Sequence, residues 1–349
     1  MTAQRDFLLF VGLAIAWGTA FVAIEVGLAT LPPLLFAALR LDLAALLFAG
    51  AVVALGHEWW PRTQADWAMI TVIGSVVIGA HYGLLFVGQS FVSSAVAAIV
   101  LSVTPIVTPP LAVALLPGAR IRVPAVVGLT LGLVGVVIVA ISGGSLDGQL
   151  LGGGLLFASA VAFALGTVLT ERLQGGGTLS IISVQTWGMA VGAVILHTAS
   201  LAHPGEHAAS GLATWTPATI AALVYLGAIA TAGGFLVYFL LLDRVGATEL
   251  SLVNYAVPAV AALVGWLVLG ETISLGTVAG FVLILLGFAC CKIDTLWRLA
   301  GPLLGHGPVR PSPAPEGGSV VVNGNRYDSA QCADGDRSTQ SNRVTPGAD

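Results

Sequence analysis

The sequence predicts an all-α integral membrane protein with ten transmembrane helices, arranged as two inverted five-helix repeats. Composition is the first reason. Of 349 residues, 57% are hydrophobic and 9% are charged, whereas soluble domains carry about 25% charged residues. The second reason is a pair of long apolar stretches, 93–117 and 247–270, with Pro105 and Pro258 near their middles. Interrupted helices at corresponding places in two halves of a chain are typical of secondary transporters.

Ten apolar segments approach the length of about 20 residues that a helix needs to cross a bilayer. Helix-start signals precede several of them, including Pro33, the pair Thr63 and Asp66, and Pro217. The first segment lacks a small-residue cleavage site after it, so we expect it to be retained. The expected spans are 7–29, 33–55, 67–88, 92–116, 123–142, 151–171, 179–201, 218–242, 247–270 and 275–293.

Basic residues in the short loops predict the orientation, because cytoplasmic loops of membrane proteins carry an excess of Lys and Arg. If the N-terminus is cytoplasmic, the loops on the opposite side carry no Lys or Arg. We therefore expect both termini in the cytoplasm of a multi-pass protein of the cell (plasma or inner) membrane. The cytoplasmic basic residues are then Arg5, Arg62, Arg120, Arg122, Arg172, Arg244, Lys292 and Arg298.

An internal duplication explains several matched features of the two halves. Aligning Pro105 with Pro258 also brings glycines of the two halves into register with a one-residue adjustment. Five spans per copy is an odd number, so the second copy would be inverted relative to the first. The matched glycines are Gly118, Gly128 and Gly135 with Gly270, Gly280 and Gly287, and Gly18 matches Gly166.

The duplication predicts a first repeat over 1–146 and a second repeat over 147–298. From about Leu299 the chain becomes rich in Pro, Gly and Ser and lacks the apolar surface needed to fold. We expect residues 299–349 to be a disordered cytoplasmic tail.

The two prolines predict helix breaks that could act in gating. A mid-helix proline frees the carbonyl four residues earlier, here that of Leu101 or Asn254. In lipid, such a carbonyl needs a protein partner or a wet cavity. A single proline can simply be tolerated in a membrane helix, and the matched pair is what favours a functional interpretation.

The chain resembles the drug/metabolite transporter superfamily, and within it the EamA-type ten-span carriers. The resemblance covers about residues 7–293 and implies ten helices, both termini inside and alternating access around a central cavity. One departure is Ala119, which stands where a Gly-Glu pair is common, whereas Gly270-Glu271 keeps that pair in the second copy. The residues that carry the resemblance are Ala16-Trp17-Gly18-Thr19, Ala37-Ala38-Leu39-Arg40, the TPIV of 104–107 and the run VGATELSLVNYAVPAVAALVGWLVLGE of 245–271.

Arg40 is the most informative candidate, because an intramembrane arginine normally faces protein or water and has a partner. Two interpretations remain open: it binds a carboxylate or phosphate of a substrate, or it fixes its helix to neighbours. Asp42 lies on the opposite face, so we expect it to pair with another helix. His81 could relay protons or simply pack. The expected substrate contacts are Trp17, Thr19, Arg40, His81, Tyr82, Gln89, Gln185, Tyr238, Asn254 and Tyr255.

These observations predict a secondary transporter, and the resemblance implies an exporter of a small polar metabolite such as an amino acid or derivative. No GxxxxGK[ST] loop is present, so ATP is not the direct energy source. One alternative is a membrane channel or scaffold, and a less favoured one is an intramembrane enzyme. We expect no catalytic residues, metal, cofactor or nucleic acid. Proton coupling and a homodimer remain open, although we expect the GxxxG motifs at Gly128 and Gly276 to pack within one chain.

Overall fold

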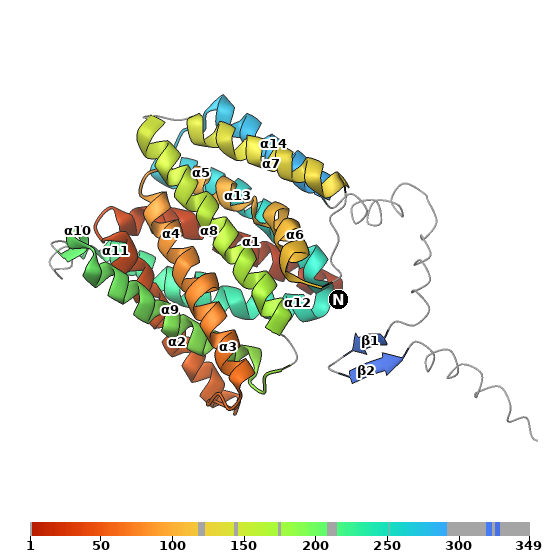
Figure 1. Ribbon diagram of the computed structural model, residues 1–349. Helices are drawn as coiled ribbons and strands as arrows, with labels where there is room; N and C mark the ends of the chain where they lie inside the picture. Colours follow the sequence, from red (N-terminus) through yellow and green to blue (C-terminus); the bar gives the residue numbers. More distant parts are fainter. Residues whose placement is uncertain are drawn as a thin grey trace, which may run out of the picture. The chain divides into compact units, whose positions relative to one another are not determined.

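The computed structural model describes residues 2–117, 123–142, 146–173, 176–207, 215–250, 252–291, 319–322 and 325–328. Two compact units make up the chain, Met1–Ile293 and Asp294–Asp349. The first unit is a bundle of packed helices (Figure 1). The first unit contains the predicted first repeat, 1–146, and residues 147–293 of the predicted second repeat, and the boundary between residues 146 and 147 stays a prediction.

Eight helical stretches of the described chain are long and apolar enough to cross a membrane, and two further apolar stretches are shorter. The eight are α1 (Thr2–Leu28), α2 (Pro33–Ala54), α3–η1–α4 (Gln64–Val72, Ile73–Ala80, His81–Gln89), α5–α6 (Ser94–Leu101, Thr104–Leu115), α7 (Val123–Ile141), α8 (Leu146–Leu173), α9 (Ile181–Ala202) and α11–η3–α12 (Pro217–Val224, Tyr225–Gly233, Gly234–Leu250). The shorter stretches are α13–η4 (Val253–Val264, Gly265–Leu269) and α14 (Leu275–Cys291), and α10 (Pro204–His207) is a single turn. The protein is therefore a helical, multi-pass membrane protein.

One helix boundary differs from the expected one. The eighth span was expected to end at residue 242, but α12 continues to Leu250, and α13 begins at Val253 rather than at 247. The expected spans left residues 243–246 as the connection between the two helices. The backbone of 243–246 is helical instead and belongs to α12, because no proline interrupts the helix there.

The two prolines act differently from each other. Ser102 and Val103 separate α5 from α6, and Pro105 lies in the first turn of α6. The hydroxyl of Thr104 donates to the carbonyl of Leu101 at 2.7 Å, which satisfies the group that Pro105 cannot bond. Pro258 instead lies inside α13, which is helical from Val253 to Val264. The helix is therefore broken beside Pro105 but not at Pro258.

Two π-helical segments, η1 and η3, occupy corresponding places in the third and eighth expected spans. Within η3 the hydroxyl of Thr231 donates to the carbonyl of Leu226, five residues earlier, at 2.7 Å. π-Helical turns are frequent at functional sites. Here they position His81, which follows η1 directly, and Ala230, which lies within η3.

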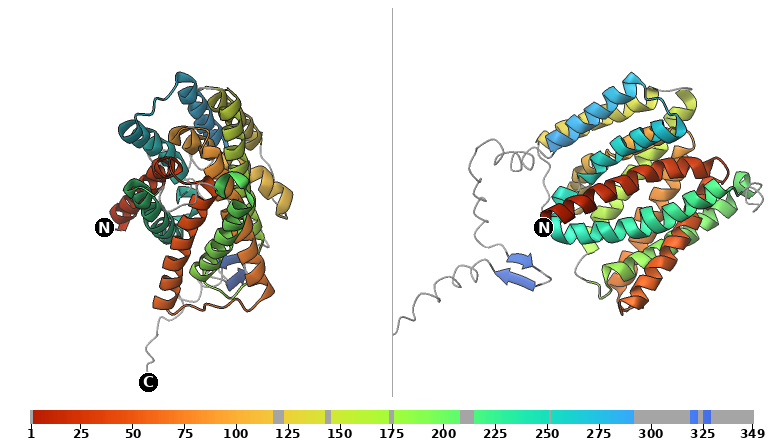
Figure 2. Two further views of the ribbon diagram at one scale, coloured as in Figure 1. Left: turned by 90° about the vertical axis from the view of Figure 1, so that its left-hand side faces the viewer. Right: turned by 180° about the vertical axis from the view of Figure 1, so that it is seen from behind.

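Close glycine contacts join α7 and α14 at one edge of the bundle, opposite the edge where α2 packs on α9 (Figures 1 and 2). A Cβ added at Gly135 would lie 2.6 Å from the carbonyl oxygen of Gly280, and one at Gly280 would lie 2.6 Å from that of Gly135. Gly128 and Gly287 meet in the same reciprocal way. These glycines therefore pack within one chain, as expected for Gly128.

The second unit contains a short antiparallel hairpin, β1 (Ser319–Val322) paired with β2 (Asn325–Asp328). An isolated two-stranded hairpin is marginally stable at best. The rest of the tail for which we expected disorder lies outside the described residues.

Candidate functional site

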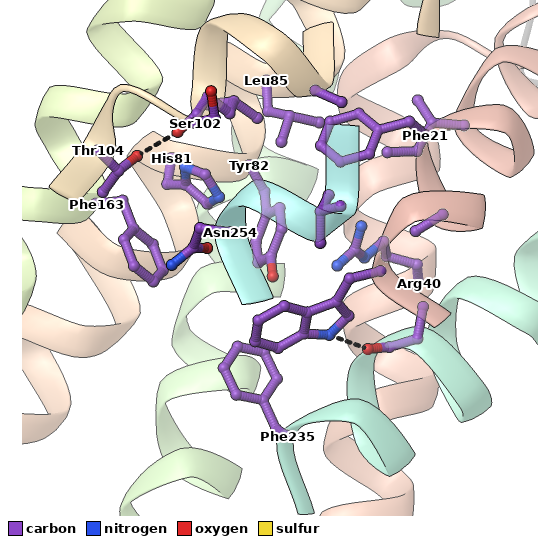
Figure 3. A pocket seen from close by; sticks show the side chains of 17 residues that line it. Phe21, Arg40, His81, Tyr82, Leu85, Ser102, Thr104, Phe163, Phe235 and Asn254 are labelled. Carbon is purple, nitrogen blue, oxygen red and sulfur yellow. Dashed lines mark hydrogen bonds between the residues drawn. The ribbon is translucent and has the colours of Figure 1, made fainter. Parts of the chain in front are cut away.

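A cavity lies in the middle of the bundle, where residues from α1, α2, α4, α5, α6, α8, η3, α12 and α13 converge (Figure 3). It holds about 830 Å³ of space not filled by atoms, open solvent included. Both halves of the chain contribute to its wall. Its lining is mainly aromatic and aliphatic, with a few polar groups, which is the usual character of a small-molecule site. Those polar side chains are Arg40, His81, Tyr82, Ser102, Thr104 and Asn254.

Arg40 brings a positive charge into this cavity from α2. Its side chain is only 4% exposed, and its Cζ lies 4.1 Å from the ring centroid of Tyr82 and 5.3 Å from that of Phe86. Its Nε has no hydrogen-bond partner. Among the described residues, no carboxylate lies within salt-bridge distance of it. The guanidinium lies against two aromatic rings, and a buried guanidinium that no acid pairs with is stabilised further when an anion reaches it.

Asp42 is not the partner of Arg40. This agrees with the prediction from its place on the opposite face of the helix. It pairs with His197 of α9, whose Nε2 lies 2.7 Å from its carboxylate oxygen. Both side chains are partly exposed, at 44% for Asp42 and 35% for His197. This contact ties α2 to α9 away from the cavity.

Trp17 forms an aromatic wall beside Arg40. Its indole N–H donates to the carbonyl of Ala230 in η3 at 3.0 Å, so a hydrogen bond crosses from α1 to the second half of the chain. The ring stacks on Tyr238 with a centroid separation of 5.6 Å and meets Phe235 edge-on at 5.9 Å. The wall is therefore fixed by one hydrogen bond and two ring contacts.

His81 is held in one tautomer by Ser159 of α8. The Ser159 hydroxyl donates to the His81 carbonyl at 2.8 Å, so its oxygen is left to accept from Nδ1, also at 2.8 Å. The Ser159 carbonyl lies 3.2 Å from the same nitrogen. Since both neighbours accept, Nδ1 carries the proton and Nε2 offers a lone pair in the neutral ring. Tyr82 and Phe163 flank the ring.

The break in the first half of the chain contributes directly to the cavity. Leu101, Ser102 and Thr104 all line it, and Asn254 from the first turn of α13 lies near Tyr82 and Phe163 (Figure 3). Ser102 and Thr104 use their hydroxyls on the carbonyls of Ile99 and Leu101, at 2.6 and 2.7 Å. The amide of Asn254 is a further uncharged polar group of the lining.

Five of the ten expected contact residues line the cavity, and five do not. Trp17, Arg40, His81, Tyr82 and Asn254 line it. Of the others, Thr19 bonds to Tyr225, Gln89 donates to the Phe21 carbonyl at 2.6 Å, Gln185 is buried in α9, Tyr238 stacks on Trp17 and Tyr255 packs on Phe288. Their roles as substrate contacts stay predictions.

Sequence reasoning missed most of the apolar lining. Phe21, Phe163 and Phe235 bring aromatic rings to the cavity from α1, α8 and α12. Aromatic residues in membrane helices face lipid, neighbouring helices and cavities alike, so their presence carries no signal of its own. One usable clue was helical spacing: Phe21 lies one turn from Trp17 on the same face of α1.

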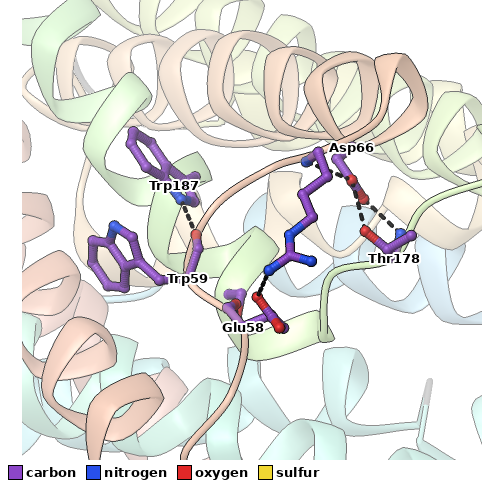
Figure 4. Close-up of polar contacts among 7 residues, drawn as sticks. Glu58, Trp59, Asp66, Thr178 and Trp187 are labelled. Carbon is purple, nitrogen blue, oxygen red and sulfur yellow. Dashed lines mark hydrogen bonds and ion pairs between the residues drawn. The ribbon is translucent and has the colours of Figure 1, made fainter.

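Beyond the cavity, a buried carboxylate ties the loop before α3 to the loop before α9 (Figure 4). Asp66 accepts from the backbone N–H of Thr63 at 3.0 Å, closing the expected capping box, and from that of Thr178 at 2.7 Å. It also accepts from the N–H of Arg62 and Leu179 and from the Thr178 hydroxyl. Trp187 adds a bond from its indole N–H to the Trp59 carbonyl at 2.8 Å.

Two carboxylates of the second half of the chain bind helix N-termini in the first half. Glu206 accepts from the N–H of Leu34 and Leu35 at 3.0 and 3.1 Å, at the start of α2. Glu271 accepts from the N–H and the hydroxyl of Ser94, both at 2.9 Å, at the start of α5. Carboxylates are stabilising at helix N-termini, where backbone N–H groups lack partners. Glu271 therefore has a structural role at the start of α5.

Comparisons with known proteins agree with this architecture. A model of the EamA-like transporter family matches residues 5–141 and again 150–291. "Probable amino-acid metabolite efflux pump" of Salmonella typhimurium is 28% identical over 291 residues, covering 82% of this chain and 94% of its own. "Uncharacterized inner membrane transporter YedA" of Escherichia coli K12 is 28% identical over 267 residues, covering 75% and 82%. A crystal structure with 20% identity and a TM-score of 0.57 covers 83% of this chain and 98% of its own, and shares the fold.

Proposed function

The chain belongs to the EamA-like transporter family, and from that membership we propose that it exports a small polar metabolite, an amino acid or a derivative of one, through the cavity around Arg40. The chain is a multi-pass membrane transporter. The proposal adds the substrate class, the direction and the site. Two observations support the class: the buried Arg40, and the relatives named for amino-acid metabolite efflux.

The single observation that carries the proposal is the state of Arg40. The guanidinium is buried beside a cavity, its Nε lacks a hydrogen bond, and no acid among the described residues pairs with it. A charge in such a place costs free energy unless it is paired. A substrate carboxylate would supply that pair, in the bidentate geometry that guanidinium favours. Trp17 and the phenylalanines would then surround the rest of the molecule.

We further propose that the ten helices form two inverted repeats, so that the cavity lies on the pseudo-two-fold axis and opens alternately to each side. If the two halves of the chain are exchanged, the contact that Asp66 makes corresponds to the contact that Glu206 makes. Asp66 holds the start of α9, and Glu206 holds the start of α2. Gly135 meets Gly280 as Gly128 meets Gly287. The two matches of one family model, and the corresponding π-helical segments, support the same arrangement.

In this proposal both termini are cytoplasmic, as the distribution of Lys and Arg predicts, and the protein resides in the cell membrane. The chain's own residues bind and orient the substrate, and a concentration gradient or a coupled ion supplies the energy. Protons remain a candidate for that ion.

A thermal-unfolding screen of the detergent-solubilised protein against metabolites tests the proposal, because a bound ligand raises the apparent melting temperature. We expect small carboxylates to stabilise the wild type and to lose this effect in Arg40→Gln. Stabilisation by carboxylates that persists unchanged in Arg40→Gln would contradict the assignment of the site.

A further inference from the structure

We propose that the cavity selects monoanionic carboxylates with an apolar body over zwitterionic amino acids of the same shape. The inference rests on the proposed function and narrows its substrate class to derivatives whose amino group is absent or acylated.

The first step is the charge of the cavity wall. Arg40 is the one Arg, Lys, Asp or Glu among the described residues that line it. Glu25 lies one turn beyond Phe21 on α1 but outside the lining, where it accepts from Gln89 at 3.5 Å. Asp42 is engaged by His197. The wall therefore offers one positive charge and no negative one.

The second step is what each kind of ligand does to that charge. A monoanion pairs with Arg40 and leaves the loaded site neutral. A zwitterion also brings an ammonium group into the cavity, where no carboxylate of the lining can pair with it. Burying an ammonium without a counter-charge is costly. The geometry thus disfavours the free amino group, whatever the side chain of the ligand.

The third step is whether aromatic faces could replace the missing carboxylate. Tyr82 already receives the guanidinium of Arg40 on its face, with 4.1 Å between Cζ and the ring centroid. Trp17 is stacked on Tyr238. Cation–π attraction for an ammonium is strongest on an open Trp or Tyr face, and both of these rings have a face already in use. The remaining Phe21, Phe163 and Phe235 suit an apolar body.

The fourth step concerns uncharged polar groups. His81 Nε2 carries a lone pair because Ser159 fixes the proton on Nδ1. Asn254 adds an amide to the lining. These groups can meet a neutral N–H or O–H of the ligand, such as the amide N–H of an N-acylated amino acid. The lining therefore matches a carboxylate, an apolar body and a neutral donor.

The experiment compares ligands with one phenyl body and different charges, by titration of the full chain in nanodiscs. The ligands are N-acetyl-L-phenylalanine and phenylpyruvate as monoanions, L-phenylalanine as the zwitterion and phenethylamine as the cation. We expect the monoanions to bind at least about tenfold more tightly than L-phenylalanine, and phenethylamine not to bind. Arg40→Gln should abolish monoanion binding, and the exposed Arg62→Gln should leave it unchanged.

A second variant tests the charge argument with almost no change of shape. Asn254→Asp adds a negative charge to the wall. We expect it to weaken binding of the monoanions and to strengthen binding of L-phenylalanine relative to them. A wild type that binds L-phenylalanine as tightly as the monoanions overturns the inference and leaves the proposed function standing. Failure of all the acids to bind, or binding that Arg40→Gln does not alter, overturns the proposed function itself.

Discussion

At the scale of single residues, Arg40 is defined by the geometry of its planar group. The guanidinium lies over Tyr82 and beside Phe86, and the same plane can present two N–H groups to a carboxylate. A lysine ammonium keeps the charge but neither stacks in this way nor binds in a fork.

Arg40→Lys should therefore weaken carboxylate binding by about tenfold, and less than Arg40→Gln does. Titration of the purified variants with N-acetyl-L-phenylalanine measures both effects. Equal affinity of Arg40→Lys and the wild type would indicate that only the charge matters, and would contradict the planar contact.

Trp17 makes a second prediction at this scale. Trp17→Phe keeps an aromatic ring but leaves the Ala230 carbonyl without the indole N–H that now lies 3.0 Å away. A lost hydrogen bond of this kind costs about 1 kcal/mol, so we expect a lower melting temperature and weaker ligand binding. Trp60→Phe is the control, because Trp60 is 59% exposed; an equal loss in both variants would contradict the specific role.

At the scale of helices and loops, carboxylates and glycines determine how the elements meet. Asp66 joins the start of α3 to the loop before α9, and close glycine contacts let α7 and α14 approach. Each contact crosses between the first and second halves of the chain, so each one stabilises the arrangement that encloses the cavity.

Asp66→Asn should destabilise the bundle by about 2–3 kcal/mol. An amide that keeps its oxygen toward Thr178 and Leu179 must turn its NH₂ toward the N–H groups of Arg62 and Thr63, which are donors themselves. Thermal unfolding measures the loss. Glu58→Gln should cost less than about 1 kcal/mol, because the ion pair of Glu58 with Arg62 is exposed. Equal costs of the two substitutions would contradict the role of Asp66.

Gly135→Ala should separate α7 from α14, because the new Cβ would lie 2.6 Å from the Gly280 carbonyl oxygen. Overpacking of this kind costs about 1–3 kcal/mol. Gly154→Ala in α8 is the matched control, since a Cβ there would meet nothing within 4 Å. Melting temperatures of the two variants decide the matter, and an unchanged Gly135→Ala protein would show that the helices do not touch as described.

At the scale of the whole molecule, the two halves provide similar scaffolds and different cavity walls. The broken helix beside Pro105 contributes Leu101, Ser102 and Thr104, whereas the unbroken α13 contributes Asn254 and Val257. In the proposed inverted-repeat arrangement, an asymmetric lining would let one side bind the charged group of a substrate and the other its polar or apolar remainder.

The orientation of the whole chain in the membrane can be tested by cysteine labelling. In a chain whose three native cysteines are replaced by serine, Phe91→Cys should react with a membrane-impermeant maleimide in intact cells. Trp60→Cys should react only after lysis. Both positions are exposed, at 41% and 59%, so accessibility to the reagent decides the result. The reverse pattern would place both termini outside.

The sequence was sufficient to predict the helices but only part of the site. Hydropathy identifies membrane helices because lipid imposes one length and one chemistry on them. Arg40, His81 and Asn254 could be recognised because polar groups are costly in lipid. Gln185, an expected contact that falls roughly where Arg40 would map in the second repeat, does not line the cavity. Repeat register relates backbones, and it does not determine where a side chain points.

We propose that a carboxylate crosses the membrane through the cavity around Arg40. Counterflow in proteoliposomes tests it most directly: liposomes loaded with unlabelled N-acetyl-L-phenylalanine are diluted into a trace of the labelled compound. We predict transient accumulation of label by the wild type and by Arg62→Gln, and none by Arg40→Gln reconstituted at equal density. Equal accumulation by Arg40→Gln and the wild type would contradict it.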